Sequence, residues 1–360
     1  MNFYFSDKNK NQIKGAKSIL TILFVLMLCM LSGCGNKIKS NYKLGAEYIS
    51  EEKYQDALVC LEQAEKDGIS IKNIYRLRGI AYIGLCDYQN AVTNLENALR
   101  ESNGIVTDTD IDINYYLATA YYKLGDYDRA EEIYSAIMEI RPKDPKSYYL
   151  RGCVSLRKDK LPAAQEDFNK AVACDKLDAT QYIRIYRELC NAGFNAEAVS
   201  YINMALSNIS KPSEYELGIF NYYIEDYTQA RNHLEASKEC KNTAEGVIYL
   251  GKTYVALGDT PYAISLCEAF IIDHPESPSI LNELGIMYAK ESEYERALDK
   301  FEKGLELNAG TDRQYLMFNR IVALERTGQF SKAKEYMKEY TAMYPMDEKA
   351  ERENIFLSSR

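Results

Sequence analysis

An alanine recurs through this 360-residue chain at nearly constant intervals. The intervals run from 32 to 39 residues, and four of the eight equal 34. A fixed period of this length predicts stacked repeat units in place of independent globular domains, because each unit covers only part of its neighbour's apolar face. The recurring residues are Ala57, Ala91, Ala130, Ala164, Ala198, Ala230, Ala263, Ala297 and Ala333.

Each recurring alanine lies inside a larger pattern. Twelve positions before it there is usually Gly or Ala, and four positions after it there is usually a bulky apolar residue. Apolar residues recur within each unit at steps of three and four, which is a helical period. Turn signals such as Gly125-Asp126, Gly258-Asp259 and Gly328-Gln329 divide the units in two. The sequence therefore predicts two helices per unit, with backbones brought close by the small residues.

This pattern resembles the tetratricopeptide repeat (TPR) family. Tyr75, Tyr148 and Tyr182 stand where that family often has Trp, and its terminal Pro corresponds to Pro142, Pro275 and Pro345. The resemblance implies an all-α, right-handed α-solenoid of about nine helix-turn-helix units over residues 41–345, with residues 346–360 as a capping helix or tail. In units five and nine, Tyr186 and Ile321 replace the small residue, so looser packing or a kink is expected there.

The first 34 residues have another character. A basic, polar stretch is followed by ILTILFVLMLCML at residues 19–31 and then by Leu31-Ser32-Gly33-Cys34. This arrangement resembles the lipobox of bacterial lipoprotein signal peptides. It implies a cleaved signal over residues 1–33, a diacylglyceryl group on Cys34, and a short linker over residues 34–40. Cys29 lies inside the apolar run and is the poorer acceptor.

An uncleaved anchor helix is the alternative to this interpretation. The run of 13 apolar residues is short for a spanning helix, which needs about 20. The lysines that precede the run favour export of the remainder. We therefore expect an outward-facing, lipid-anchored protein of the bacterial cell membrane. The sequence leaves open whether the envelope has one membrane or two and which membrane holds the protein. It also leaves the oligomeric state open.

The overall charge and the cysteine pattern exclude several classes. A net charge of −9 disfavours binding to nucleic acid phosphates. Seven cysteines beyond residue 34 show no C-x-x-C pair, so neither a zinc site nor a disulfide framework is expected.

Two segments match sequence motifs of ligand-binding sites, but neither lies in the sequence context that such a site requires. GVIYLGKT at residues 246–253 fits the P-loop expression, but Gly251 is in phase with the small residues of the other units. The acidic stretch Asp108–Asp112 begins like an EF-hand and lacks its Gly and its final Glu, so helix capping is preferred and calcium binding stays open. The two histidines, His233 and His274, lie near no cluster. We expect no catalytic residues, metal, cofactor or nucleotide.

The TPR resemblance also implies a binding surface. In that family the first helices of the units line a concave groove that holds peptides or partner helices. A Lys and Asn clamp for chaperone tails is absent here, because the corresponding pairs are Tyr42/Ala46 and Arg76/Ile80. The positions carried over are Tyr42, Arg76, Ile80, Tyr115, Thr119, Tyr122, Tyr149, Cys153, Ile183, Arg187, Tyr215, Ile219, Tyr222, Lys252, Asn282, Ile286 and Phe318.

This set is rich in Tyr and aliphatic residues, which are enriched at interfaces, although several of the tyrosines could equally pack between repeats. The sequence thus predicts a non-enzymatic, membrane-tethered scaffold of the cell envelope, with a protein or peptide, or an apolar partner helix, as the ligand. The alternative is a lipoprotein subunit of a secretion, pilus or outer-membrane assembly machine. An enzyme is a third hypothesis, and no residues support it.

Overall fold

The computed structural model describes residues 41–66, 68–307 and 309–359, and every regular element in these ranges is a helix. None of the helices described is long and apolar enough to cross a membrane. The predicted signal, Cys34 and the linker lie outside the described residues. The chain forms two compact units, one with residues up to 85 and 90–113, the other with residues 86–89 and 114 onward.

The first unit begins with a helical segment that includes residues 41–50. Its other helices are α2 (Tyr54–Lys66), α3 (Ile71–Gly84) and α4 (Tyr88–Arg100), and α5 (Asp108–Leu124) begins in it. Leu61, Ala64, Ile74 and Leu77 form its apolar cluster.

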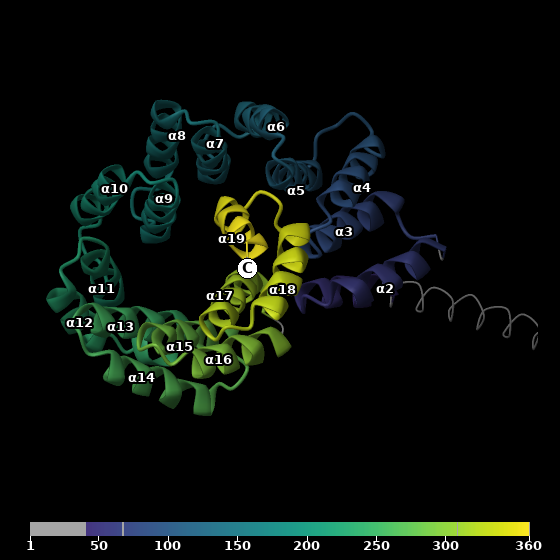
Figure 1. Cartoon of the computed structure of the whole chain (residues 1–360). Helices are drawn as coiled ribbons and strands as arrows, with labels where there is room; N and C mark the ends of the chain where they lie inside the picture. Colours follow the sequence, from purple (N-terminus) through teal and green to yellow (C-terminus); the bar gives the residue numbers. More distant parts are fainter. Residues whose placement is uncertain (1–40, 67, 308, 360) are drawn as a thin grey trace, which may run out of the picture. The chain divides into compact units, whose positions relative to one another are not determined.

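The second unit continues from α5 as a succession of helix pairs. Its elements are α6 (Tyr127–Ile140), α7 (Pro145–Arg157), α8 (Leu161–Cys174), α9 (Ala179–Asn191), α10 (Asn195–Asn208), α11 (Glu214–Tyr223), α12 (Tyr227–Ala236), η1 (Cys240–Asn242), α13 (Ala244–Ala256), α14 (Thr260–Asp273), α15 (Pro278–Lys290), α16 (Tyr294–Glu306), η2 (Gly310–Asp312), α17 (Arg313–Arg326), α18 (Phe330–Met343) and α19 (Glu348–Ser358). First helices such as α7, α9 and α11 follow one another in one row, and second helices such as α8, α10 and α12 follow in another (Figure 1).

The recurring alanines lie in the core of the helix pairs. All nine are fully buried on second helices. The small residue of the paired first helix lies against the bulky residue four positions after the alanine. A methyl group added at Gly152 would lie 2.5 Å from Phe168, and one added at Gly285 would lie 2.3 Å from Phe301. The predicted close approach of the two helices is therefore present, and only a side chain without bulk fits at these points.

The turn between the two helices of each pair has one conformation throughout. The residue five positions before each recurring alanine has positive φ, between 55° and 88°. Glycine supplies this conformation at residues 125, 193, 258 and 328. In the other five pairs an L-residue adopts this left-handed conformation, which is strained for any residue with a Cβ atom. These residues are Glu52, Cys86, Asp159, Glu225 and Ser292. Five of the nine turns thus form without the glycine signal that the sequence analysis relied on.

Units five and nine accommodate their larger residues by different contacts. Ile321 is fully buried in a cluster with Met317, Leu324 and Met337. Tyr186 is half-buried, and its ring lies 4.2 Å from that of Tyr223 on α11. The larger side chain is accordingly covered by the neighbouring elements.

The end of the array is covered by α19. Its side chains Ala350 and Leu357 are buried in the cluster that contains Ala333 and Met337 of α18. Asp347 caps the helix by accepting hydrogen bonds from the backbone N–H groups of Lys349 and Ala350. The tail that was expected to cap the last unit therefore packs as one more helix.

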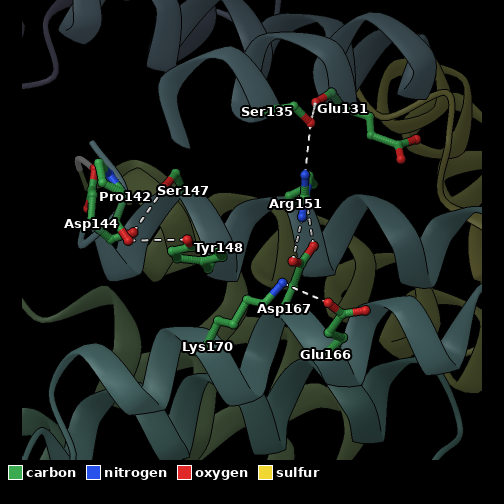
Figure 2. A network of polar contacts seen from close by, with 10 residues as sticks. All are labelled: Glu131, Ser135, Pro142, Asp144, Ser147, Tyr148, Arg151, Glu166, Asp167 and Lys170. Carbon is green, nitrogen blue, oxygen red and sulfur yellow. Dashed lines mark hydrogen bonds and ion pairs between the residues drawn. The ribbon is translucent and has the colours of Figure 1, made fainter. Parts of the chain in front are cut away.

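Second helices are tied to first helices by polar contacts as well. Arg151 on α7 donates to both carboxylate oxygens of Asp167 on α8 and to Ser135 on α6 at 3.0 Å (Figure 2). Beside it, the Tyr148 hydroxyl donates to the carbonyl of Pro142 at 3.1 Å and closes the loop between α6 and α7 (Figure 2). One arginine thus links three helices of two successive pairs.

Candidate protein-binding surface

The residues expected to bind a partner lie on the first helix of each pair. In the second unit these helices are α5, α7, α9, α11, α13, α15 and α17, and we call their side facing away from the second helices the first-helix surface. Several helices of this row contact one another directly, including α7 with α9, α11 with α13, and α15 with α17. The row therefore brings side chains from successive repeats side by side.

Polar contacts join neighbouring helices across this surface. Arg157 donates from Nε to the Tyr122 hydroxyl at 3.1 Å. Asn319 donates to Asn282 at 2.9 Å. Each of these pairs is separated by 35–37 residues, so a side chain of one repeat bonds to its counterpart in the next. This ladder presents Tyr122 and Asn282 in fixed positions.

The densest part of the ladder surrounds Arg187 on α9. Its guanidinium donates to the hydroxyls of Tyr223 (2.9 Å) and Tyr249 (2.5 Å), and it lies 3.4 Å from a carboxylate oxygen of Glu245. The two tyrosine hydroxyls are also hydrogen-bonded to each other at 2.7 Å. Three successive first helices, α9, α11 and α13, are thereby connected.

Predicted residues of α9 and α11 pack around this network. Ile183, Tyr215 and Tyr222 are half-buried against the cluster that contains Ile219 and Leu250. Burial raises the pKa of Tyr222 to about 12, and it does the same for Tyr122 on α5. A tyrosine with an ordinary pKa near 10 is already protonated at neutral pH, so burial extends the protonated, hydrogen-bond-donating state of both residues to more alkaline pH.

Two carboxylates lie in the row, half-buried Glu188 and buried Glu283, which is 6% exposed. The Tyr149 hydroxyl lies 3.5 Å from a carboxylate oxygen of Glu188. Burial raises the pKa of Glu188, although the positive charges of Arg157 and Lys123 act to lower it. Lys252 lies 3.3 Å from Glu283, whose pKa burial also raises. Each acid is thus matched by a basic group on a neighbouring first helix.

A few predicted residues have little surface to offer a ligand. Tyr115 is 6% exposed, Cys153 7% and Ile219 3%. The Tyr115 hydroxyl bonds to Asp144, and the Thr119 hydroxyl donates to the carbonyl of Tyr115 at 2.8 Å. These positions support the helix row more than they line its surface.

The last helices of the row are more open. Ile286 on α15 is 39% exposed and Tyr315 on α17 is 61% exposed. Phe318 is partly buried, with its ring 5.6 Å from that of Tyr340. An apolar segment could therefore contact α15 and α17 directly, whereas α9 and α11 present a hydrogen-bonded aromatic surface.

The predicted residues of the first unit make their contacts within that unit. Tyr42 and Ile80 pack, partly buried, on the cluster of α2 and α3. Arg76 donates from Nε to Asp112 at 2.6 Å, which is another contact between successive first helices.

The sequence analysis missed the partners of the predicted residues. Tyr223, Tyr249, Arg157 and Asn319 were not among the expected positions, yet they complete the ladder. A signal for three of them exists in the sequence: Arg157, Tyr223 and Asn319 each follow a predicted position by 35–37 residues, which is one repeat length plus one to three. Tyr249 follows Arg187 by 62 residues and lacks this signal.

The two segments that match ligand-binding motifs have structural roles in the helix pairs. Residues 246–253 lie within α13, where the backbone is helical and Gly246 meets the backbone of Cys240. Asp110 accepts hydrogen bonds from Lys72 at 2.7 Å, from Ser102 at 2.5 Å and from the Thr107 backbone at 2.9 Å. These bonds hold its pKa below the ordinary value despite burial. Within the described ranges, no three His, Cys, Asp or Glu side chains converge on a point that could hold a metal ion.

Comparison with known proteins agrees with this architecture. Family models described as tetratricopeptide repeat match residues 83–152 and residues 250–311. The chain contains tetratricopeptide repeats. With helix pairs continuing outside the two matched segments, its fold is an all-α TPR solenoid. TPR proteins in general bind other proteins, and most are not enzymes, so protein–protein interaction is the broad function that this fold suggests.

Several solved structures are similar at low sequence identity. Yeast Tom70 shares 14% identity with a TM-score of 0.49, over 90% of this chain and 88% of that one. A TPR protein from Parabacteroides merdae shares 14% with a TM-score of 0.44, over 80% and 99%. MamA from Desulfovibrio magneticus shares 20% with a TM-score of 0.40, over 48% of this chain and 94% of that one. No curated protein matches the chain.

Proposed function

We propose that this TPR protein is a non-enzymatic, membrane-tethered scaffold of a bacterial cell envelope, and that it holds a protein or peptide partner on the first-helix surface. The observation that carries the proposal is the row of side chains on successive first helices, fixed by contacts from one repeat to the next. Prearranged side chains lose little conformational entropy when a partner binds, so such a surface favours association.

The tether rests on Leu31-Ser32-Gly33-Cys34 behind a basic and apolar leader. Two acyl chains on Cys34 would give stable anchoring, since a single chain gives only marginal, reversible binding. Intact-mass measurement tests this step separately. The wild-type chain should lack residues 1–33 and carry a diacylglyceryl mass on Cys34, whereas Cys34→Ala should keep its leader and gain no lipid. A wild-type protein with an intact leader would instead identify an uncleaved anchor.

Partner capture tests the surface. We would isolate the protein from detergent-solubilised envelopes and compare a double variant of the exposed first-helix residues, Ile286→Glu/Tyr315→Glu, with the wild type. The matched control changes two exposed residues of the second helix α14, Tyr262→Glu/Ile272→Glu, which are 43% and 78% exposed. Recovery of the partner should fall for the first-helix variant only. Equal recovery from both variants would contradict binding at this surface.

The same preparation separates a scaffold from a machine subunit. A fixed stoichiometry with integral membrane proteins, kept through size-exclusion chromatography, would favour a component of an envelope assembly. Variable, salt-sensitive recovery would favour a recruiting scaffold. In both cases α15 and α17 are expected to contact the partner.

A further inference from the structure

The described part of the chain begins at one edge of the first unit. The helical segment that includes residues 41–50 is followed by α2, α3 and α4, and the short connections between these helices make neighbours antiparallel. The first helices therefore begin, and the second helices end, at the same edge. We call it the anchor edge. It carries Asn41, the loop of residues 68–70 and the loop of residues 101–107, whereas the turn of residues 51–53 lies at the opposite edge.

Contacts between helix ends agree with this placement. Lys72 at the start of α3 pairs with Asp110 at the start of α5 at 2.7 Å. Asp110 also accepts hydrogen bonds from the Ser102 hydroxyl at 2.5 Å and from the Thr107 backbone N–H at 2.9 Å. The loop of residues 101–107 is thereby fixed beside the start of α3 on the anchor edge.

The tip of this loop exposes two adjacent apolar side chains. Ile105 is 69% exposed and Val106 is 58% exposed. Gly104 precedes them with a φ of 84°, and the Ile105 backbone N–H donates to the side-chain oxygen of Asn103 at 3.2 Å. The tip thus has a defined conformation, so burying its side chains would cost little further conformational entropy.

The adjacent pair differs from the rest of this unit's surface. Among the residues described in the first unit, the other large apolar side chain that is exposed is Val59, in the middle of α2. A single exposed apolar residue is ordinary, whereas apolar residues that are exposed together indicate a contact with another surface. The feature to be explained is therefore the pair at the loop tip.

The charges around the tip disfavour an anionic ligand. Glu101 and Asp108 are exposed on either side of it, and Lys72 is already paired with the buried Asp110. Exposed acids are repelled by anionic headgroups, so charge would not draw this loop to a membrane. The tip fits an occupant that buries apolar surface and needs no negative charge.

The length of the preceding chain brings the anchor edge close to the predicted lipid. Residues 35–40 are all that separates Cys34 from Asn41, and a chain of seven residues spans at most about 25 Å. The 13-residue helix α2 is about 20 Å long, so the opposite edge is farther from the lipid by that length. A diacylglyceryl group on Cys34 would therefore keep Ile105 and Val106 on the side of the unit nearest the bilayer.

We propose that Ile105 and Val106 insert into the lipid bilayer beside the Cys34 anchor, so that the first unit lies with its anchor edge on the membrane surface. Insertion removes both side chains from water and requires no anionic headgroup. This inference rests on the lipid tether proposed above and adds a second membrane contact to it. It does not depend on the partner held by the first-helix surface.

A photoactivatable lipid tests the contact in the wild-type chain. The lipidated full-length protein is reconstituted in vesicles of phosphatidylcholine that carries a diazirine on one acyl chain, irradiated and digested with trypsin. Cleavage after Arg100 and Lys123 places the tip in the peptide 101–123, and Val59 lies in the peptide 54–66. Lipid adducts should form on peptide 101–123 and not on peptide 54–66, although Ile105 and Val59 are equally exposed at 69%.

A double variant and a matched control assign the adduct to the tip. Ile105→Ser/Val106→Ser should lower the yield of adduct on peptide 101–123 by about tenfold or more, because both apolar side chains are lost. Val59→Ser should leave that yield unchanged, and circular dichroism verifies that both variants fold. Adding phosphatidylglycerol should not raise the yield. An adduct that forms only with phosphatidylglycerol would assign the contact to charge and overturn the insertion.

The intact mass of the same sample separates this inference from the tether. A protein with the diacylglyceryl mass on Cys34 and no adduct on peptide 101–123 would overturn the insertion and leave the tether standing. A protein without the lipid would reject both. A photoreactive residue in place of Ile105 that crosslinks a discrete protein in the native cell, with no lipid adduct in vesicles, would assign the tip to a protein partner instead.

Discussion

Arg151 on α7 donates two parallel hydrogen bonds to Asp167 on α8, from Nε to Oδ2 at 2.8 Å and from Nη2 to Oδ1 at 2.7 Å. The Asp167 side chain is 4% exposed and that of Arg151 is 25% exposed. A bidentate pair of this kind fixes the orientation of both groups. Because Arg151 also reaches Ser135 on α6, the pair sets how one helix pair meets the next.

Removing either partner of this pair should destabilise the fold. Arg151→Leu leaves the Asp167 carboxylate buried without its main donor, at an expected cost of about 2–3 kcal/mol in the free energy of unfolding. Urea unfolding of Arg151→Leu, Asp167→Leu and the double variant forms a mutant cycle. The double variant should lose less than the sum of the single changes, and strict additivity would show that the pair contributes no coupling.

A methyl group at Gly152 should be tolerated poorly, since it would lie 2.5 Å from Phe168. Gly152→Ala is expected to cost about 1–3 kcal/mol, the range for overpacked cores, although Ala is the better helix former. Phe168→Leu in the same chain should recover part of the loss by making room. Ser207→Ala on the exposed face of α10 is the control and should change the urea midpoint little. A neutral Gly152→Ala would contradict the close packing of α7 on α8.

Strained turns offer a stabilising substitution. Ser292 has a φ of 63°, where Gly stands at 258 with a φ of 88° in the preceding pair. Ser292→Gly should raise the free energy of unfolding by about 1 kcal/mol, because the left-handed conformation costs an L-residue more than it costs glycine. Ser207→Gly, in a helix, should lower it by about as much. A loss of stability in Ser292→Gly would show that the turn is not strained.

Alkaline pH should unfold the protein through its buried tyrosines. Burial raises the pKa of Tyr134 and of Tyr201 to about 12. In the unfolded chain a tyrosine ionises near pH 10, so the unfolded state gives up these protons first. The free energy of unfolding is therefore constant below about pH 9 and falls as pH rises from about 10 to 12.

Urea midpoints measured across this range, with phenolate absorbance as the second readout, check the alkaline transition. The absorbance of the buried tyrosines should rise together with unfolding. Tyr134→Phe and Tyr201→Phe should each make the decline shallower, whereas Tyr262→Phe, an exposed tyrosine, should not. A decline of the same slope in all four proteins would assign the alkaline loss to other groups.

The helix pairs follow from local sequence rules, which is why they could be predicted. The recurring alanines and the glycines twelve positions earlier encode a contact within one pair, such as that of Gly152 with Phe168. Such a contact depends only on the helical period and on side-chain volume. The turns at Cys86 and Glu225 escaped prediction because their left-handed backbone is imposed by the packed helices on either side and not by a glycine.

The contacts on the first-helix surface depend on how one repeat is placed on the next. A single sequence predicts this placement less well than it predicts the contacts within one helix pair. Tyr115 occupies a position expected to face a ligand, yet it is buried beside Asp144, which lies in the loop after the pair. Arg187 appeared as a single charge, whereas its hydrogen bonds to Tyr223 and Tyr249 join three helices. The sequence thus predicts which type of side chain occupies each position. Predicting which residue it contacts also requires knowing how far one repeat is shifted along the next.

Site-specific photo-crosslinking in the native cell tests the central claim most directly. A photoreactive phenylalanine analogue would replace Ile286 or Tyr315 on first helices, and Tyr262 or Ile272 on the second helix α14. If the first-helix surface holds a protein partner, the first two positions should give a discrete crosslinked protein and the last two should not. Discrete crosslinks from Tyr262 and Ile272 only, with none from Ile286 or Tyr315, would place the partner on the other side of the array and contradict the account.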